Sequence, residues 1–241
     1  EDVTPSSLDI IRGSFPLVSP DGIFVIGGDK GTIFYSTTFN EWISSGSQSN
    51  QTSEFQSCNE LVFGGDYYYT ACYRSILVSH DGNLWLYEPY ELSSLGDIQL
   101  TSLMWADDRL WAMGGGKRVY ATKNAGASWS LQVSLQIQED DDMDIDYLMY
   151  SGDDFLGIGT DKLDGVENPI IVHSEDGETW TVIGSSAMIY SIAKTTSDDL
   201  GGKWLGAGLG GLFVSDDLAQ WTILEPVNGD CWSIVSHNSH Y

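Results

Sequence analysis

The segment SEDGETW at residues 174–180 decides the fold, because a turn of the same kind recurs along the chain. A serine opens the segment, an Asp-Gly pair bends it and a tryptophan closes it. The related segments are STTFNEW (36–42), SHDGNLW (79–85), TKNAGASW (122–129) and SDDLAQW (215–221). Successive closing tryptophans are 43, 44, 51 and 41 residues apart. Repeats of this length indicate a fold assembled from similar units.

Apolar runs precede each of these turns, and they have the length of β-strands. The earlier runs are FPLVS (15–19), ELVFGG (60–65), TSLMWA (101–106), YLMYSG (147–152) and MIYSIA (188–193). The later runs end in small residues and are IFVIGG (23–28), YYYTAC (67–72), LWAMGGG (110–116), FLGIGT (155–160) and WLGAGLG (204–210). A third strand leads into each turn and a fourth follows the tryptophan. The pattern predicts an all-β fold, a β-propeller of four-stranded antiparallel blades.

The recurring turns resemble the Asp box, the repeat of the bacterial neuraminidase type of propeller, which has the form Ser/Thr-x-Asp-x-Gly-x-x-Trp. Two of the segments are one residue shorter but keep every named residue type, and STTFNEW keeps only Ser36 and Trp42. The resemblance implies structural roles for Ser79, Asp81, Gly82, Trp85, Asn124, Gly126, Trp129, Ser174, Asp176, Gly177, Trp180, Ser215, Asp217 and Trp221. We expect the Asp and Ser side chains to bond the backbone of their own turn.

The repeat spacing predicts one propeller over residues 1–241, with five complete blades that end near Trp42, Trp85, Trp129, Trp180 and Trp221. The segment CWSIV at 231–235 aligns with CNELV at 58–62, the start of the second blade. Residues 226–241 are therefore expected to begin a partial sixth blade or to supply a strand that closes the ring. A segment of a larger propeller is the slightly favoured alternative.

The chain is strongly acidic, with a formal net charge of −25 from 35 acidic and 10 basic residues. Such a charge repels phosphate backbones and anionic lipids, which argues against nucleic-acid and membrane-surface binding. A run of 18 apolar residues, which a spanning helix needs, does not occur in the sequence. The sequence is 41% hydrophobic and 12% aromatic, so a folded protein is expected.

The resemblance allows an enzyme, because sialidases of this fold use an arginine triad, a Tyr nucleophile helped by a Glu, and an acid/base Asp. The arginines of this chain are Arg12, Arg74, Arg109 and Arg118, and they occupy different positions in their repeats. A shared carboxylate-binding triad is therefore not expected. A glycosidase that uses two facing carboxylates remains the alternative, although the sequence does not identify the pair.

The leading prediction is a non-enzymatic binding or structural propeller that recognises a glycan or a protein partner. We expect the protein outside a cell, at a cell surface or on a viral particle. It could be part of a larger assembly there. Aromatic side chains suit both kinds of partner. The strand YYYTACY (67–73) is a candidate patch, with core packing as the favoured interpretation.

Two acidic stretches, EDDDMDID (139–146) and DKLDGVEN (161–168), are interpreted as solvated loops. Oxygen-rich loops can bind calcium, so Asp140, Asp142 and Asp144 are weak calcium candidates. No other metal or cofactor is expected, since His80 and His173 fall in different repeats.

Three cysteines occur, at positions 58, 72 and 231. A hairpin that turns near Gly65 places Cys58 and Cys72 roughly opposite each other, so a disulfide between them is predicted. Free buried thiols are the alternative.

Overall fold

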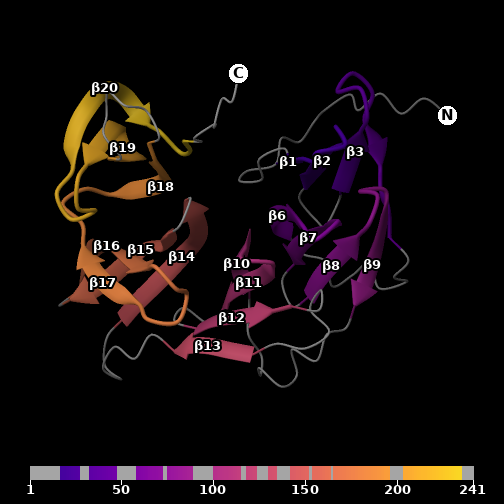
Figure 1. Ribbon diagram of the computed structural model, residues 1–241. Coiled ribbons are helices and arrows are strands. Elements are labelled where there is room, and N and C mark those ends of the chain that lie inside the picture. Colours follow the sequence, from indigo (N-terminus) through magenta and orange to yellow (C-terminus); the bar gives the residue numbers. More distant parts are fainter. Residues whose placement is uncertain are drawn as a thin grey trace. The chain divides into compact units, whose positions relative to one another are not determined.

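The computed structural model describes residues 17–27, 33–47, 58–72, 75–88, 100–114, 118–123, 130–134, 142–151, 154–163, 165–195 and 203–234. Every regular element in these ranges is a β-strand (Figure 1). Among the same residues, no helix is present that could cross a bilayer. The chain divides into two compact units, residues 1–115 with 119–131 and residues 116–118 with 132–241.

The first unit contains two complete sheets and most of a third. The first sheet runs in the order β1 (Leu17–Val18), β2 (Phe24–Gly27), β3 (Ile33–Ser36) and β4 (Ile43–Ser44). The second runs β5 (Gly46–Ser47), β9 (Leu84–Glu88), β8 (Ser75–Ser79), β7 (Tyr67–Cys72) and β6 (Cys58–Gly64). The third runs β10 (Leu100–Ala106), β11 (Arg109–Gly114), β12 (Arg118–Thr122) and β13 (Ser130–Ser134).

The second unit contains two sheets. The fourth sheet of the chain runs β14 (Asp142–Ser151), β15 (Asp154–Leu163), β16 (Val166–Ser174) and β17 (Thr181–Gly184). The fifth runs β18 (Ile189–Lys194), β19 (Trp204–Ser215) and β20 (Thr222–Asp230).

The prediction of antiparallel four-stranded sheets is confirmed for the first, third and fourth sheets. The second sheet differs because the short strand β5 pairs in parallel with β9. The fifth differs because β19 pairs with β18 through its first half and with β20 through its second half, so that one long strand covers the positions of two.

Neighbouring sheets pack face to face through apolar side chains. In the first unit, Val25 and Ile33 of the first sheet join Trp85 of the second in one core, and Tyr69 joins Leu103 of the third in another. In the second unit, Leu156 and Ile171 pack with Ile192, Trp204 and Phe213. Most of this stabilisation is apolar area removed from water.

The aromatic strand β7 is buried on both faces, so its core interpretation is the one that the structure supports. Tyr68 and Tyr69 point to opposite faces, yet each is only 1% exposed, because sheets cover both sides. Tyr67 alone among these tyrosines reaches the surface, at 37% exposure.

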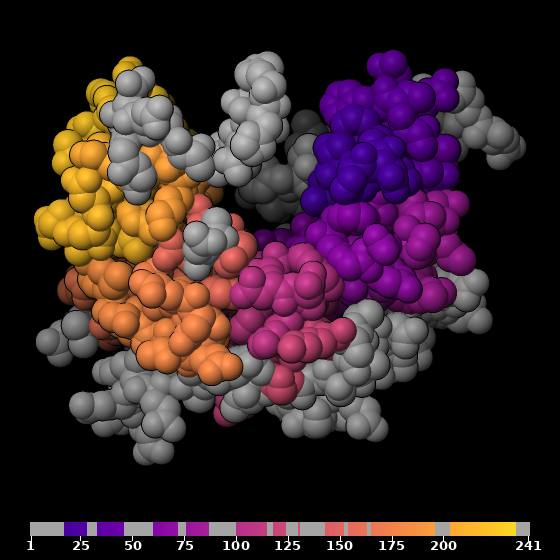
Figure 2. All heavy atoms as spheres, viewed as in Figure 1, coloured from indigo at the N-terminus to yellow at the C-terminus, as the bar shows by residue number. Residues whose placement is uncertain are grey.

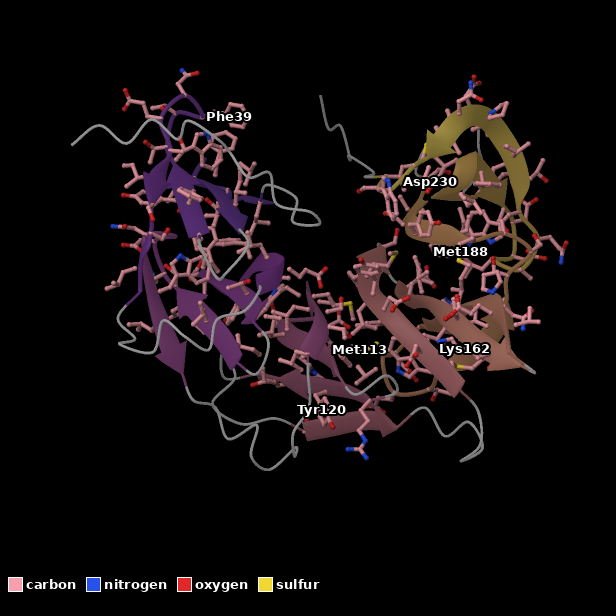
Figure 3. All side chains as sticks on the ribbon, turned by 180° about the vertical axis from the view of Figure 1, so that it is seen from behind. Phe39, Met113, Tyr120, Lys162, Met188 and Asp230 are labelled. Atoms are coloured by element: carbon pink, nitrogen blue, oxygen red, sulfur yellow. The ribbon has the colours of Figure 1, made fainter. Side chains whose placement is uncertain are left out.

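Four of the recurring turns share one backbone conformation. The third residue after the opening serine has a positive φ in each: Phe39 (65°), Gly82 (71°), Gly177 (72°) and Leu218 (65°). Glycine adopts this conformation without the penalty that a Cβ brings. Leu218 offsets that penalty by burial, at 3% exposure. Phe39, labelled in Figure 3, is 56% exposed, and the centroid of its ring lies 5.1 Å from that of Phe24.

Side chains of the same turns bond their own backbone. Asp176 Oδ1 accepts hydrogen bonds from the N–H groups of Glu178 and Thr179, at 2.8 and 2.7 Å. The Trp180 indole donates to the carbonyl of Gly177 at 3.0 Å. Equivalent bonds form around Asp81 with Trp85 and around Asp217 with Trp221. Residues 124–129, which include Asn124, Gly126 and Trp129, lie outside the described residues.

Candidate binding site

A cluster of charged side chains joins the fourth and fifth sheets. Asp154 begins β15 and is buried, with 6% exposure. Its Oδ1 atom lies 2.7 Å from Nε2 of His173 on β16, and its Oδ2 atom accepts a hydrogen bond from Lys194 Nζ on β18. The three strand ends therefore meet at one carboxylate.

Electrostatics favour the ionised form of this carboxylate. Burial raises the pKa of Asp154, but the hydrogen bonds from Lys194 and His173 outweigh it, so the pKa lies below its ordinary value. Lys194 Nζ also lies 4.9 Å from the centroid of the Trp204 ring, a cation–π contact. The side chains of Lys194 and His173 are 39% and 23% exposed, so both reach solvent.

The chemistry of this cluster suits holding two sheets together better than it suits catalysis. It joins one carboxylate to an ammonium and an imidazole, whereas glycoside hydrolysis uses two carboxyl groups. Each basic group spends a hydrogen bond on Asp154, and the backbone N–H of Lys194 also donates to Ser151 Oγ at 2.7 Å. These bonds fix the fifth sheet against the fourth.

Contacts between residues 43 positions apart recur at several sheet junctions. Ser151 and Lys194 are one such pair. In the first unit, Glu60 Oε2 accepts hydrogen bonds from Leu103 N, 43 positions on, and from Ser102 Oγ, each at 2.7 Å. At the end of the second unit, Ser191 Oγ accepts a hydrogen bond from the N–H of Ile234 and donates one to its carbonyl oxygen, each at 3.3 Å. These two residues are again 43 positions apart. The repeat spacing is thus also the spacing of the junction contacts.

Most of the described residues of the two acidic stretches lie in strands, residues 142–146 in β14 and residues 161–163 and 166–168 in β15 and β16, so their interpretation as loops was wrong there. The stretch around Asp144 lies on β14, with Met143 and Ile145 buried while Asp144 and Asp146 are exposed. This alternation is typical of a half-buried strand. The described residues of the second stretch lie at the paired ends of β15 and β16, where Lys162, labelled in Figure 3, lies opposite Glu167. The two side chains form an ion pair with an N–O distance of 3.2 Å.

Carboxylates gather on these extended strands. We call Asp144, Asp146 and Glu167 the acidic edge. Although Asp146 is exposed as a whole residue, partial desolvation of its carboxyl raises its pKa, as do the nearby charges of Asp144 and Glu167, while Lys162 opposes the shift. Of the calcium candidates, Asp140 and the side chain of Asp142 fall outside the described residues, and Asp144 is exposed. Within the described ranges, no group of three or more His, Cys, Asp or Glu side chains could hold a metal ion.

Of the arginines and histidines singled out in the sequence, the structure describes Arg109, Arg118, His80 and His173. The Arg109 guanidinium lies 5.8 Å from the ring of Trp111, and Arg118 is exposed at the start of β12. His80 contacts the ring of Tyr67 at 5.5 Å in the first unit, whereas His173 belongs to the second. Arg12, Arg74, His237 and His240 lie outside the described residues.

Strand β20 is the exposed edge of its sheet. All nine of its residues are exposed, and Ile223, Leu224 and Val227 keep 48%, 51% and 40% of their surface open to solvent. The strand belongs to the yellow surface of its unit in Figure 2. It has no lysine or arginine, and its charged residues are Glu225 and Asp230. The repeat predicts a fourth strand at this position, but it does not predict that the strand is exposed along its whole length.

The sequence matches no family model and no curated protein. Similar solved structures are β-propellers. YCF48 from Cyanidioschyzon merolae aligns at 14% identity and a TM-score of 0.60, over 87% of this chain and 70% of its own. The WD40 propeller domain of Doa1 aligns at 12% identity and 0.58, over 91% and 70%.

The extracellular domain of the putative one component system BT4673 from B. thetaiotaomicron aligns at 9% identity with a TM-score of 0.65. The match covers 98% of this chain but only 32% of that larger chain. At these identities the likeness establishes the fold. The chain is an all-β protein with the β-propeller fold.

Proposed function

We propose that the protein is a non-enzymatic binding propeller, placed outside a cell or on a viral particle, that recognises an extended segment of a protein partner. The observation that carries this proposal is strand β20, an edge strand whose nine residues are all exposed. Open strand edges offer backbone donors and acceptors to an added strand. Ile223, Leu224 and Val227 supply the apolar contact that such a partner needs.

Charge selects among partners of this kind. The strand carries Glu225 and Asp230 with no basic residue, within a chain of net charge −25. A partner segment with lysine or arginine beside apolar residues is therefore favoured, and raised salt should slow its association. Pro226 has no N–H group, so strand pairing is divided into the stretches on either side of it.

Similar proteins support a binding role. One of the YCF48 structures holds a D1 peptide, and aligns with 88% of this chain at 16% identity and a TM-score of 0.61. BT4673 contributes an extracellular domain. A peptide-binding propeller outside the cell is the function that these observations and the exposed edge favour together.

A library of displayed random peptides tests the proposal. We expect enrichment of basic, apolar peptides, and at least tenfold weaker binding of an enriched peptide after Ile223→Ser with Leu224→Ser. Val182→Ser on β17 is the matched control, because Val182 is also an exposed fourth-strand residue, at 41%. Absence of enrichment, or equal weakening by the control, would refute the proposal. Binding on a glycan array without peptide binding would replace the protein partner by a sugar.

Two further proposals concern the architecture, namely the type of the recurring turns and the role of residues 231–234. We propose that the four similar turns are Asp boxes, supported by the positive φ that they share. Backbone N–H groups donate to the hydroxyls of Ser36, Ser174 and Ser215. In three of the turns they also donate to the carboxylates of Asp81, Asp176 and Asp217. We also propose that residues 231–234 open a further repeat. The Ser191 hydroxyl accepts a hydrogen bond from the N–H of Ile234, just as the Glu60 carboxylate accepts one from the N–H of Leu103. Slow hydrogen exchange at Ile234 that Ser191→Ala abolishes would support this placement, and fast exchange in the wild type would contradict it.

The acidic edge supports a second candidate, a hydrolase that uses a pair of carboxyl groups. A carboxyl whose pKa is raised can hold the proton that a leaving group needs, and Asp146 is such a group beside other carboxylates. Release of reducing sugar from a polysaccharide panel, lost in Asp146→Asn but kept in Glu178→Gln, would establish it. No release by the wild type would eliminate it.

A further inference from the structure

The register of β6 and β7 brings two cysteines opposite each other. From Gly64 opposite Tyr67 to Glu60 opposite Ala71, the two strands pair without interruption. Continued unchanged, this register would place Cys58 opposite residue 73. The register instead shifts between Cys58 and Glu60, and Cys58 pairs with Cys72.

The shift leaves Asn59 as the extra residue of a β-bulge. One inserted residue is what a strand needs to change its partner by one position. The bulge therefore has a specific consequence, because without it the two cysteines would be out of register.

Residues that face each other in an antiparallel pair have the spacing that a disulfide requires. Their Cα atoms are about 4.5 Å or about 5.5 Å apart, depending on whether the pair exchanges hydrogen bonds. Disulfides join cysteines whose Cα atoms are about 4.4–6.8 Å apart. Both kinds of facing pair fall in this range, so backbone placement alone makes Cys58 and Cys72 competent to join.

We propose that Cys58 and Cys72 form a disulfide that closes the β6–β7 hairpin. The two thiols lose two protons and two electrons, and a sulfur–sulfur bond forms between them. A small-molecule disulfide such as oxidised glutathione accepts the electrons and protons and is itself cleaved to two thiols. The bond lies two residues from Glu60, whose carboxylate holds the neighbouring sheet, so it stiffens the strand at that junction.

The third cysteine provides an internal reference. Cys231 is a free, partly buried thiol in the second unit. Because Cys231 lies outside the β6–β7 hairpin, its alkylation serves as a control for thiol reactivity that does not depend on the proposed disulfide.

Intact mass after alkylation tests the proposal. The full chain is equilibrated with oxidised glutathione, unfolded in guanidinium and treated with N-ethylmaleimide, with or without prior reduction. We expect one maleimide without reduction, mapped to Cys231, and labelling of all three cysteines after reduction. Three maleimides without reduction, or a bridge that includes Cys231, would overturn the proposal.

Matched variants separate the bond from a packing role of the thiols. Reductant should lower the melting temperature of the wild type and of Cys231→Ser by several degrees, but leave that of Cys58→Ser and Cys72→Ser unchanged. The same loss in all four proteins would assign the effect elsewhere and contradict the proposal. Neither result depends on peptide binding, so the test is independent of the proposed function.

Discussion

Glu60 and Asp154 both lie where one sheet meets the next, but the groups that face them differ. Glu60 accepts hydrogen bonds from the hydroxyl of Ser102 and the backbone of Leu103, which are neutral donors. Burial outweighs these bonds and raises the pKa of Glu60 from 4.5 to about 7. Asp154 is faced by Lys194 and His173, and its pKa lies below its ordinary value.

The same type of contact therefore acts on stability in opposite directions at the two junctions. A carboxylate held by neutral donors loses hydration without gaining a counter-charge, so its ionisation opposes folding. A carboxylate held by cations gains more than it loses, so its ionisation supports folding. The first unit is therefore expected to prefer mildly acidic solution at its junction, and the second to require a pH at which Asp154 is charged.

The largest loss of stability is expected when a side chain is added at Gly64, near the Glu60 junction. The ring of Trp105 lies directly against the backbone of Gly64, and a Cβ on Gly64 would overlap the ring. Gly64→Ala should lower the free energy of unfolding by about 3 kcal/mol, the upper part of the range for overpacking. Urea unfolding measures it. Gly184→Ala is the control, because a Cβ there meets open space, and an equal loss in both variants would contradict the packing explanation.

Removing the cation at the Asp154 junction should have the next largest effect. Lys194→Met removes one of the two basic partners of the buried Asp154 carboxylate and leaves the other, His173. Loss of one partner of a fully buried pair costs about 3–5 kcal/mol, and the partial exposure of Lys194 reduces the expected loss to about 2 kcal/mol. The measurement is urea unfolding at pH 7. Lys203→Met, which removes an exposed ion pair with Asp216, should change stability by less than about 0.5 kcal/mol.

A smaller effect of opposite sign is expected at Glu60. Glu60→Gln keeps an oxygen that can accept both hydrogen bonds but removes the charge. Since the pKa in the folded protein is raised, the wild type loses stability as the pH rises from about 4.5 to about 7. The variant should be about 1–2 kcal/mol more stable at pH 8, after allowance for partial exposure, and unchanged at pH 4. Thermal unfolding at both values would show this, and a variant less stable at pH 8 would disprove it.

The recurring turn made the fold predictable from sequence. Ser174, Asp176 and Trp180 carry local chemistry, because each bonds backbone within five residues of itself, and local bonds leave a readable pattern. The strand alternation of Met143, Asp144 and Ile145 was equally readable, but the run of acids concealed it.

The charged cluster could not be predicted in the same way. Asp154, His173 and Lys194 are distant in sequence and belong to three strands of two sheets, so only the packing of those sheets brings them together. The repeat predicts which residues lie near a junction but not which side chains bond there. The outward edge of β20 escaped prediction because its length departs from the repeat.

The pH dependence of three proteins tests the contrast between the two junctions most directly. The free energy of unfolding of the wild type, Glu60→Gln and Asp154→Asn is measured in urea from pH 3 to pH 8. We predict that the free energy of unfolding of Glu60→Gln rises relative to that of the wild type between pH 4.5 and about 7, and that the difference is constant above this range. Asp154→Asn should fall behind the wild type as the pH rises to about 3.8 and then stay below it. Two difference curves of the same sign, or two that do not change with pH, would show that the two carboxylates do not act on stability in opposite directions.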